Sequence, residues 1–358
     1  IFRNRKIGWP CRCTKTRSSH EIVSSVANTS YRHRIKSRCT KTRNNNALLR
    51  RLKEKGNVRP FGGGNVILEE IMYVDSSTIN ANSYSGYEAL NVGENSPISA
   101  AQFSIVQYAA AVAMSGLQVL QNSGKEQIID LLEGRIRVAE SQLMNRIDYD
   151  LYTDGTGNGS RNIVGLDAAV PTSPVTGTYG GINRGDWSFW RSQVYAGVAD
   201  GGATVSAANI TAYMTSLALE CVRGRNMPDL WIHGATYYGF YVNALQSIQR
   251  VTDDGGGKGV GMGFPSLKFF GGGIAADVVL GGGVNMAVNT DGTVGGATAA
   301  AAWALNTDYI FFRPHRDRNF VPIGGEREST NQDAVVRLIG WAGNMTSSGP
   351  QFSGKLVA

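Results

Sequence analysis

The sequence predicts an α+β protein, and three observations lead to this fold class. A long central stretch repeats apolar residues at helical spacing, and stretches on both sides of it alternate apolar and polar residues as half-buried strands do. The rest is rich in glycine, with 45 glycines in 358 residues, and only 18% of all residues are charged. Because charge is depleted at the centres of protein interfaces, this composition suggests a surface that other copies of the chain cover.

The positive charge is concentrated at the N-terminus. Residues 1–45 hold 12 of the 35 cations and, in Glu21, one of the 28 anions, which leaves 23 cations, 27 anions and a net charge of −4 for the remainder. The sequence therefore predicts a basic arm joined to a mildly acidic body. The arm has no apolar period, so we expect it to be disordered in isolation and able to touch nucleic acid by neutralising phosphates.

The arm also holds three of the four cysteines and two of the four histidines. One interpretation is a zinc site with the ligands Cys11, Cys13, His20, His33 and Cys39. Their spacing matches no standard zinc finger, so a solvated tail without a metal is the alternative. The body contains Cys221 alone, which indicates a reduced intracellular protein. We expect no membrane span and no secretory signal, because no long apolar run occurs.

The body begins with a short helix and an extended hairpin. A helix is predicted from Asn46 to about Gly56, followed by a glycine turn at 62–64 and a strand over Val66–Val74. A polar, turn-rich excursion occupies Asp75–Gln102, and a second strand follows over 103–115. Two strands joined by so long an excursion predict an extended hairpin rather than a tight one.

The clearest predicted element is a helix over Ser123–Leu151. Ser123 and Glu126 form a capping box, in which each side chain satisfies a backbone N–H of the other residue. At 1.5 Å per residue the helix is about 40 Å long. We expect a sheet to pack against it, and we expect Leu132→Asp to abolish folding or assembly. A single apolar stripe at helical spacing follows the cap: Ile128, Leu132, Ile136, Ala139, Leu143, Ile147 and Leu151.

Short helices and strands separated by glycine loops make up the rest. Helices are predicted over 205–224 and 235–251, with a strand over 228–234 between them. Alternating strands are predicted over 305–325 and 333–345. One face of the last strand carries Val335, Arg337, Ile339 and Trp341, and the other carries Val336 and Leu338.

A tripeptide near the C-terminus resembles a kinase catalytic loop. His315-Arg316-Asp317 matches the start of the pattern H-R-D-x-x-x-x-N, in which the Asp takes the substrate proton and the Asn holds magnesium. Pro322 stands in place of the Asn and cannot bind a metal. The tripeptide therefore does not predict a phosphotransferase.

A glycine-rich segment resembles a phosphate-binding loop. Gly255–Gly263 reads GGGKGVGMG, but Gly259 follows Lys258 where a Walker loop needs Ser or Thr to bind magnesium. A flexible loop tip is the preferred interpretation. A nucleotide-binding enzyme that uses this loop is the least favoured alternative.

The other titratable residues show no spacing typical of an active site. His233 and His315 have no Ser, Cys or carboxylate at a sequence spacing typical of a nucleophile–base pair. Asp154–Asn158 faintly resembles a calcium loop without its alternating ligands, so a turn is favoured. We therefore predict no catalytic, cofactor-binding or metal-binding residue, and no enzymatic activity. Surface charges are the preferred interpretation of Asp148, Asp150 and Asp253-Asp254.

Six blocks, taken in order, resemble the major capsid proteins of tailed bacteriophages. They are NNALLRRLKEKGNV, YSGYEALNV, LQNSGKEQIIDLLEGRI, GGINRGDWSFWRSQVY, NTDYIFFRPHRDRNFVPIGG and NQDAVVRLIGWAGNMT. The resemblance covers about residues 46–358 and does not extend to the arm at residues 1–45.

The resemblance implies the capsid fold named for phage Hong Kong ninety-seven. Its expected parts are an N-terminal arm, a peripheral domain with a spine helix and a sheet, an axial domain, and an extended hairpin that lies over a neighbouring subunit. Gly255–Gly263 would be the tip of the axial domain. In residue numbers the arm is 1–45, the peripheral domain 46–74, 103–155 and 303–358 with its spine at 123–151, the hairpin 75–102, and the axial domain 156–302.

The resemblance also implies a structural function. Copies would assemble into hexamers and pentamers of an icosahedral shell, expanded from a precursor, that encloses double-stranded DNA held without sequence specificity. Further expected partners are a cement or decoration protein, a scaffolding protein and a portal, but no membrane. The protein would be assembled in the host bacterial cytoplasm and reside in the phage head, and an encapsulin-like compartment shell is the alternative.

Two residue-level expectations follow from this resemblance. Arg313, Arg316 and Arg318 are expected to bind neighbouring subunits. Some shells of this type join the hairpin to a neighbour through a Lys–Asn bond, but residues 74–107 contain no Lys, so a non-covalent lattice is expected.

Overall fold

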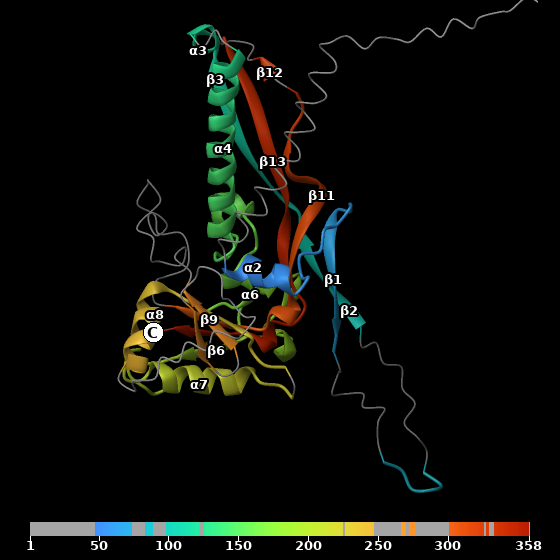
Figure 1. Cartoon of the computed structure of the whole chain (residues 1–358). Coiled ribbons are helices and arrows are strands. Elements are labelled where there is room, and N and C mark those ends of the chain that lie inside the picture. The colour runs from blue at the N-terminus through green and yellow to red at the C-terminus, as the bar shows by residue number, and fades with distance from the viewer. Residues whose placement is uncertain are drawn as a thin grey trace, which may run out of the picture.

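Two bodies joined side by side make up the described part of this computed structural model (Figure 1). The long body contains the longest helix and three long strands, and the compact body contains a six-stranded sheet. The basic arm, most of the excursion at 75–102 and the Gly255–Gly263 loop lie outside the described residues. The structure describes residues 47–73, 83–88, 98–121, 125–224, 226–246, 266–269, 272–276, 301–325, 327–328 and 333–357.

The long body is a single helix on an antiparallel sheet. Helix α4 spans Lys125–Asp150 and packs against strand β3, Val106–Ser115. The central strand β13, Ala334–Ser347, pairs on one side with β3 and on the other with β11, Ile310–Pro322, and with β12, Arg327–Glu328. The predicted long helix is thus confirmed, whereas its capping residue Ser123 and the side chain of Leu132 lie outside the described residues.

The described part of the helical stripe is buried as predicted. Ile136, Ala139, Leu143 and Ile147 each expose 5% or less, while Val138 on the other side of α4 is 57% exposed. In β3 the even-numbered residues, such as Val112 and Met114, are the buried ones. Burying this stripe is what holds α4 to the sheet, at roughly 1.5–3 kcal/mol for each large aliphatic side chain.

Strand β13 departs from the predicted alternation. It is a strand over the predicted residues, but from Ile339 onward every residue to Ser347 is buried, so the two faces do not differ. The physical reason is its central position between β3 and β11, and its course from the long body into the compact one. A strand covered on both faces loses the polar face that period-two patterning needs.

The hairpin strands are β1, Val66–Met72, and β2, Ile98–Ser104, paired antiparallel from Val66↔Ser104 to Met72↔Ile98. The single strand predicted over 103–115 is wrong. The chain breaks at Ile105, so that β2 pairs with β1 while β3 pairs with β13. Regular pairing also starts before the predicted end of the excursion at Gln102.

The compact body contains a mixed sheet in the order β6-β14-β10-β7-β9-β8. Helices α7, Ile210–Cys221, and α8, Ala235–Gln246, pack beside it and share a second apolar cluster with it. Both helices were predicted, and α7 starts later than expected. The strands are β6 Gln193–Ala196, β14 Gly354–Val357, β10 Ala302–Leu305, β7 Leu230–His233, β9 Gly272–Ala276 and β8 Ser266–Phe269.

The strand predicted over 305–325 is wrong as one element. Strand β10 ends at Leu305 in the compact sheet, the 3-10 turn η3 covers Thr307–Tyr309, and β11 starts at Ile310 in the long sheet. The chain crosses between the bodies here. Strands β10 and β14, which the predicted boundaries assign to the peripheral domain, therefore lie in the sheet of the compact body.

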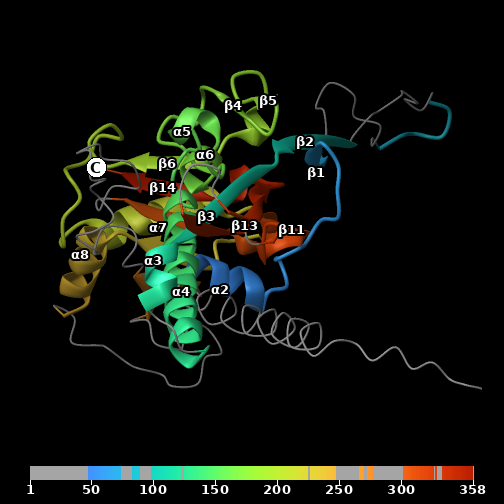
Figure 2. The ribbon, with the colours of Figure 1, turned by 90° about the horizontal axis from the view of Figure 1, so that it is seen from above.

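Short elements complete the structure, and Figure 2 shows α2 beside α4 and the hairpin extending away from both bodies. None of the helices in the described ranges combines the length and apolar character needed to cross a bilayer. The short elements are α2 Ala47–Glu54, α3 Gly116–Gln121, α5 Gly157–Ser160, α6 Leu166–Ala169, β4 Thr178–Tyr179, β5 Ile182–Asn183, η1 Ser188–Trp190 and η4 Pro350–Phe352.

We expect Ile147→Asp to lower the free energy of unfolding by more than about 3 kcal/mol, because it places a charge in the buried stripe of α4. Val138→Asp on the exposed side of the same helix is the matched control and should change it by less than about 0.5 kcal/mol. Denaturant unfolding followed by circular dichroism measures both. Equal effects of the two substitutions would contradict the assignment of the buried stripe.

Candidate functional site

The kinase-like tripeptide lies on a bulge of β11. Pro314 pairs with Gly343 and the next pair is Asn319↔Trp341, so residues 315–318 have a single residue opposite them. The Asp317 side chain is exposed on this bulge, and its backbone N–H donates to His315 Nδ1 at 3.1 Å. The structure therefore makes the tripeptide a turn within a strand and not a catalytic loop.

The two histidines of the body lie in different sheets. His233 in β7 is fully buried, and burial lowers its pKa to about 4, while the backbone of Tyr237 offsets only part of this effect. His315 is half-buried, and its ring lies edge-to-face with Phe61, with the ring centroids 5.0 Å apart. Burial also raises the pKa of the Cys221 thiol to about 12, so that this cysteine stays protonated and unreactive.

The interpretation of Asp148 and Asp150 as surface charges is wrong. They expose only 6% and 0%. Asp150 accepts hydrogen bonds from Tyr108 Oη at 2.7 Å, Arg146 Nε at 3.0 Å and Asn162 Nδ2 at 3.3 Å. Burial raises the pKa of Asp150, and the bonds from Tyr108 and Arg146 oppose that rise. The last turn of α4 is covered because strand β3 and the following loop fold over it.

The calcium-like segment is a turn, as favoured. Asp154 Oδ1 accepts from the backbone N–H of Thr156 at 3.0 Å and from its hydroxyl at 2.8 Å. Asn158 has a φ of 52°, a left-handed conformation that Asn tolerates. Within the described ranges, no group of three or more His, Cys, Asp or Glu side chains could hold a metal ion. The proposed zinc ligands of the arm, Lys258 and Asp253-Asp254 lie outside those ranges.

Arg313 is used inside the chain. Its Nε lies 2.5 Å from Glu69 Oε1, and the Thr346 hydroxyl donates to the same oxygen at 2.8 Å. Glu69 is 4% exposed, so this contact fixes the hairpin strand β1 to the long sheet. Arg313 is therefore already paired within its own chain, whereas Arg316 is exposed, and the expected contacts of these arginines with neighbouring subunits stay a prediction.

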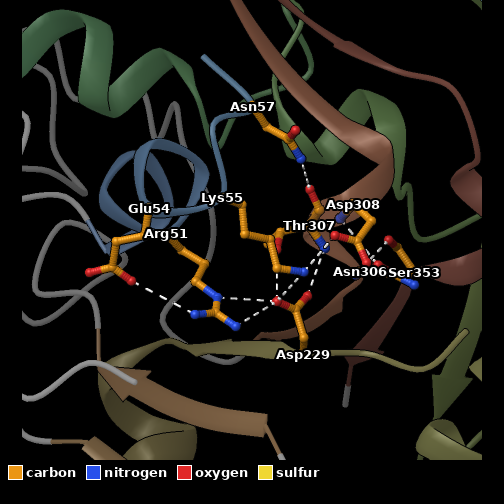
Figure 3. Close-up of polar contacts among 9 residues, drawn as sticks. All are labelled: Arg51, Glu54, Lys55, Asn57, Asp229, Asn306, Thr307, Asp308 and Ser353. Atoms are coloured by element: carbon orange, nitrogen blue, oxygen red, sulfur yellow. Dashed lines mark hydrogen bonds and ion pairs between the residues drawn. The ribbon is translucent and has the colours of Figure 1, made fainter. Parts of the chain in front are cut away.

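The most extensive polar cluster lies where the two bodies meet, and we call it the polar junction (Figure 3). Asp229, just before β7, is its centre. Its carboxylate accepts from the Thr307 backbone N–H and from the Thr307 hydroxyl, both at 2.7 Å. Two cations of helix α2 reach the same carboxylate, Arg51 Nε at 3.1 Å and Lys55 Nζ at 2.9 Å. Strand β7, the turn η3 and helix α2 are thereby tied to one side chain.

Side chains also satisfy the backbone around this junction. Asn57 Nδ2 donates to the Thr307 carbonyl at 2.6 Å, and the Asn306 N–H donates to the Ser353 hydroxyl at 3.3 Å. Asn306, Thr307 and Ser353 each expose 2% or less. A buried turn between two sheets has backbone groups that neither sheet can pair, and these side chains replace the missing partners.

The electrostatics of the junction favour a fixed charge. Burial alone would raise the pKa of Asp229, but the bonds from Thr307 and Lys55 outweigh it and hold the pKa below its usual value. The resulting stabilisation is therefore present above the unfolded pKa of about 3.9 and is lost as the pH falls further, through the lower folded-state pKa. A carboxylate held ionised by cations and a hydroxyl suits structural bonding rather than proton transfer.

One face of the hairpin is exposed within the described residues, and it carries several apolar side chains together with Glu70. Along β1 the odd-numbered residues Ile67 and Ile71 are buried, but Leu68 is 56% and Met72 77% exposed. Opposite Met72, Ile98 of β2 is 57% exposed. A two-stranded ribbon has two faces and the body covers one of them, so the other is available to another molecule.

Aromatic contacts fix the direction of this hairpin. Tyr73, after β1, stacks on Phe189 with centroids 5.1 Å apart, and Trp187 lies 5.5 Å from the same tyrosine. The Gln102 N–H of β2 donates to the Gly180 carbonyl at 2.8 Å. The ribbon is thus oriented by the folded chain itself, before any partner binds.

A second uncovered surface is a groove between α4 and β3. Its volume is about 450 Å³, and small residues such as Ala111, Ala113 and Gly134 line it together with Val138. Arg135 crosses its rim and donates to the Ala113 carbonyl at 2.7 Å. The groove has no cluster of titratable groups, so it suits an apolar contact rather than catalysis.

Sequence reasoning found the first hairpin strand, β1, but missed most of β2 and the whole polar junction. Asp229 and Arg51 are 178 positions apart, and neither belongs to a motif. The one local signal is the dipeptide Asn306-Thr307, whose side chains favour turns and which interrupts an otherwise apolar stretch.

The comparisons with known proteins bear on the fold. No family model and no curated protein matches the sequence. Among solved structures, the capsid asymmetric unit of cyanophage A-1(L) is 15% identical, with a TM-score of 0.55 over 84% of this chain and 90% of its own. The capsid of a native GTA particle is 12% identical, with a TM-score of 0.51 over 85% and 88%. The mature capsid of bacteriophage PhiM1 is 11% identical, with a TM-score of 0.52 over 85% and 86%.

These likenesses extend along almost the whole described chain and define the fold. It is the fold of tailed-phage capsid proteins, the Hong Kong ninety-seven type, so the predicted fold class is confirmed.

We expect Asp229→Ala to lower the free energy of unfolding by about 2 kcal/mol, because Arg51, Lys55 and the Thr307 N–H lose their shared acceptor. Asp308→Ala is the matched control, since Asp308 also binds Lys55 but its side chain is 64% exposed. It should cost less than about 0.5 kcal/mol. Thermal and denaturant unfolding of both variants measure the difference, and a cost at Asp308 equal to that at Asp229 would contradict the central role of Asp229.

Proposed function

We propose that this chain is the major capsid protein of a tailed bacteriophage. Copies associate into hexamers and pentamers of an icosahedral shell that encloses double-stranded DNA, and the role is structural rather than enzymatic. The single observation that carries the proposal is the capsid fold, which matches solved phage capsid subunits over more than four fifths of both chains.

The uncovered surfaces support assembly with further copies. The hairpin carries exposed Leu68, Met72 and Ile98 away from both bodies, while the groove between α4 and β3 exposes small apolar residues elsewhere. Because these are different surfaces on one subunit, a contact between them would be heterologous. A heterologous contact that closes on itself generates rings such as pentamers and hexamers.

The parts of the chain take the roles of the fold in this proposal. The long body, with α4 as the spine helix, is the peripheral domain, and the compact body with β10 and β14 is the axial domain. A portal, a scaffolding protein and a cement protein are the further partners. Assembly takes place in the host bacterial cytoplasm, and the finished subunit resides in the phage head.

Expression of the full chain tests the proposal. Negative-stain microscopy of the purified product should show closed icosahedral particles or ring-shaped capsomers. Particles from phage-infected cells should contain nuclease-protected double-stranded DNA and a portal at one vertex. A subunit that remains monomeric under all conditions of salt and crowding would refute the proposal, and particles filled with an enzyme would favour the compartment alternative.

We expect the double substitution Leu68→Asp with Met72→Asp to prevent particle formation without unfolding the subunit, because both side chains are exposed in the single chain. Leu68→Met with Met72→Leu is the matched control, which keeps the face apolar and should assemble. Sedimentation velocity and microscopy report assembly, and circular dichroism reports folding. Normal particles from the charged variant would exclude this face from the lattice.

We expect mature particles to separate into single, uncrosslinked chains on a denaturing gel. The hairpin segment at residues 74–107 contains no Lys, so it cannot supply the amine of a Lys–Asn bond. Ladders of higher mass that survive boiling in detergent and reductant would contradict a non-covalent lattice.

A further inference from the structure

The bulge of β11 places arginines outside the regular strand. Residues 315–318 leave the ladder with β13, and the neighbouring segment at 57–61 holds them from the other side. The Phe61 N–H donates to the Pro314 carbonyl at 3.1 Å, and the Arg316 N–H donates to the Phe61 carbonyl at 2.9 Å. Both edges of the bulge are therefore fixed by hydrogen bonds.

A strained residue closes the bulge. Phe320 has a φ of 54° and is 5% exposed, so a bulky side chain is held in the left-handed region while it is buried in the core. Such a conformation is unfavourable for a bulky residue and persists only where the surroundings enforce it. Bulges of this kind redirect side chains at functional positions.

Arg316 and Arg318 belong to the bulge, and Arg59 belongs to the segment that pairs with β11 beside it; we call these three residues the arginine bulge. The Arg59 guanidinium lies 4.2 Å from the centroid of the Phe311 ring, and Arg59 is exposed. Arg316 is exposed on the bulge itself. Arg318 Nη1 donates to Gln107 Oε1 of β3 at 3.0 Å, which draws this arginine toward that strand.

The sheet face beside the arginine bulge is small and uncharged. In β3 the odd-numbered residues are exposed, and their partners on β13 are apolar. Within the described residues of these two strands no acidic side chain lies on this face, so a polyanion meets no repulsion there. The residues concerned are Gln107, Ala109, Ala111 and Ala113 of β3, with Val336, Leu338 and Gly340 of β13.

We propose that the arginine bulge is a contact site for the phosphate backbone of double-stranded DNA. The inference rests on the proposed function for its choice of duplex DNA as the polyanion. Guanidinium groups bind phosphate oxygens in a bidentate manner, and a flat uncharged face admits a duplex without shape-specific contacts. The Phe311 ring is buried and cannot stack on a base, so the contact reads no sequence.

The charge of the body limits this contact to a few points. Residues 46–358 carry four more anions than cations, so a duplex is repelled by most of the surface and held at the bulge. The negative charge of Asp317, next to the arginines, lowers the affinity for the duplex further. A shell that must release its DNA through one vertex is served by such a weak, sequence-independent contact.

The test compares two triple variants of the full-length protein, kept unassembled as verified by sedimentation velocity. The first is Arg59→Gln with Arg316→Gln and Arg318→Gln. The matched control is Arg137→Gln with Arg161→Gln and Arg223→Gln, which removes the same charge from exposed positions on other elements. The probe is a fluorescent 30-base-pair duplex of mixed sequence, titrated at several salt concentrations.

We expect the bulge variant to bind about tenfold more weakly, and the slope of log K against log salt to fall by about 2–3, since each lost phosphate contact removes about 0.9. The control should change the slope by less than about 1, because its three substituted arginines lie on other elements than the bulge. The basic arm is present in both proteins and contributes equally to both slopes. Circular dichroism must show both variants folded. Equal slopes in the two variants would overturn the proposal.

Microscopy of the same proteins under assembly conditions separates this inference from the proposed function. If the bulge variant keeps its affinity for the duplex but loses particle assembly, the arginines bind a second copy and the DNA contact is refuted. If the wild-type protein forms no particles while the slopes still differ, the proposed function fails and the DNA contact stands.

Discussion

The placement of the two bodies depends on the polar junction around Asp229. The chain crosses between the two sheets at η3 and again at η4, and buried backbone groups in such a crossing have no strand to pair with. Asp229 and Ser353 supply hydrogen-bond acceptors at the first crossing, and two cations of α2 neutralise the carboxylate. The junction therefore supplies hydrogen-bond partners to the backbone at these crossings, as neighbouring strands do inside each sheet. A carboxylate with four partners is also costly to disrupt, so the angle between the bodies is well defined.

With the bodies held at this angle, much of the surface of the single chain stays uncovered. The long body is one helix on one sheet and the hairpin is two strands, so neither can bury both of its faces within the chain. The aromatic contacts of Tyr73 nevertheless orient the hairpin in the single subunit, which reduces the ordering entropy that binding would otherwise require. The scarcity of charge, the exposed apolar side chains and the fixed hairpin are the three features on which the proposed assembly with further copies rests.

Local patterns predicted the elements whose surroundings are simple, and long-range contacts account for the rest. The stripe of α4 and the strand β1 follow from periodicity because one neighbouring layer decides which of their residues are buried. Strand β13 was located correctly, but its alternation fails where both of its faces are covered. The same reasoning was wrong for Asp148 and Asp150, whose burial depends on Tyr108 and Asn162 from other elements. The break at Ile105 and the crossing at Leu305 were missed because both adjoining segments are apolar and alternate. The polar junction joins residues 178 positions apart and has no periodic signal.

The tripeptide His315-Arg316-Asp317 has two interpretations, a catalytic-loop motif in the sequence and a strand bulge in the structure. Its polar residues interrupt an apolar strand, which is why it resembled a catalytic loop in the sequence. In the structure the same interruption is a bulge, closed by the left-handed Phe320, and it exposes arginines that a regular strand would have paired across the sheet. Local sequence rules fail most often where a protein maintains strain for a purpose. A regular strand would place one residue opposite Ala342, whereas the bulge places four there, so the extra residues add polar and charged side chains that the sheet itself does not pair.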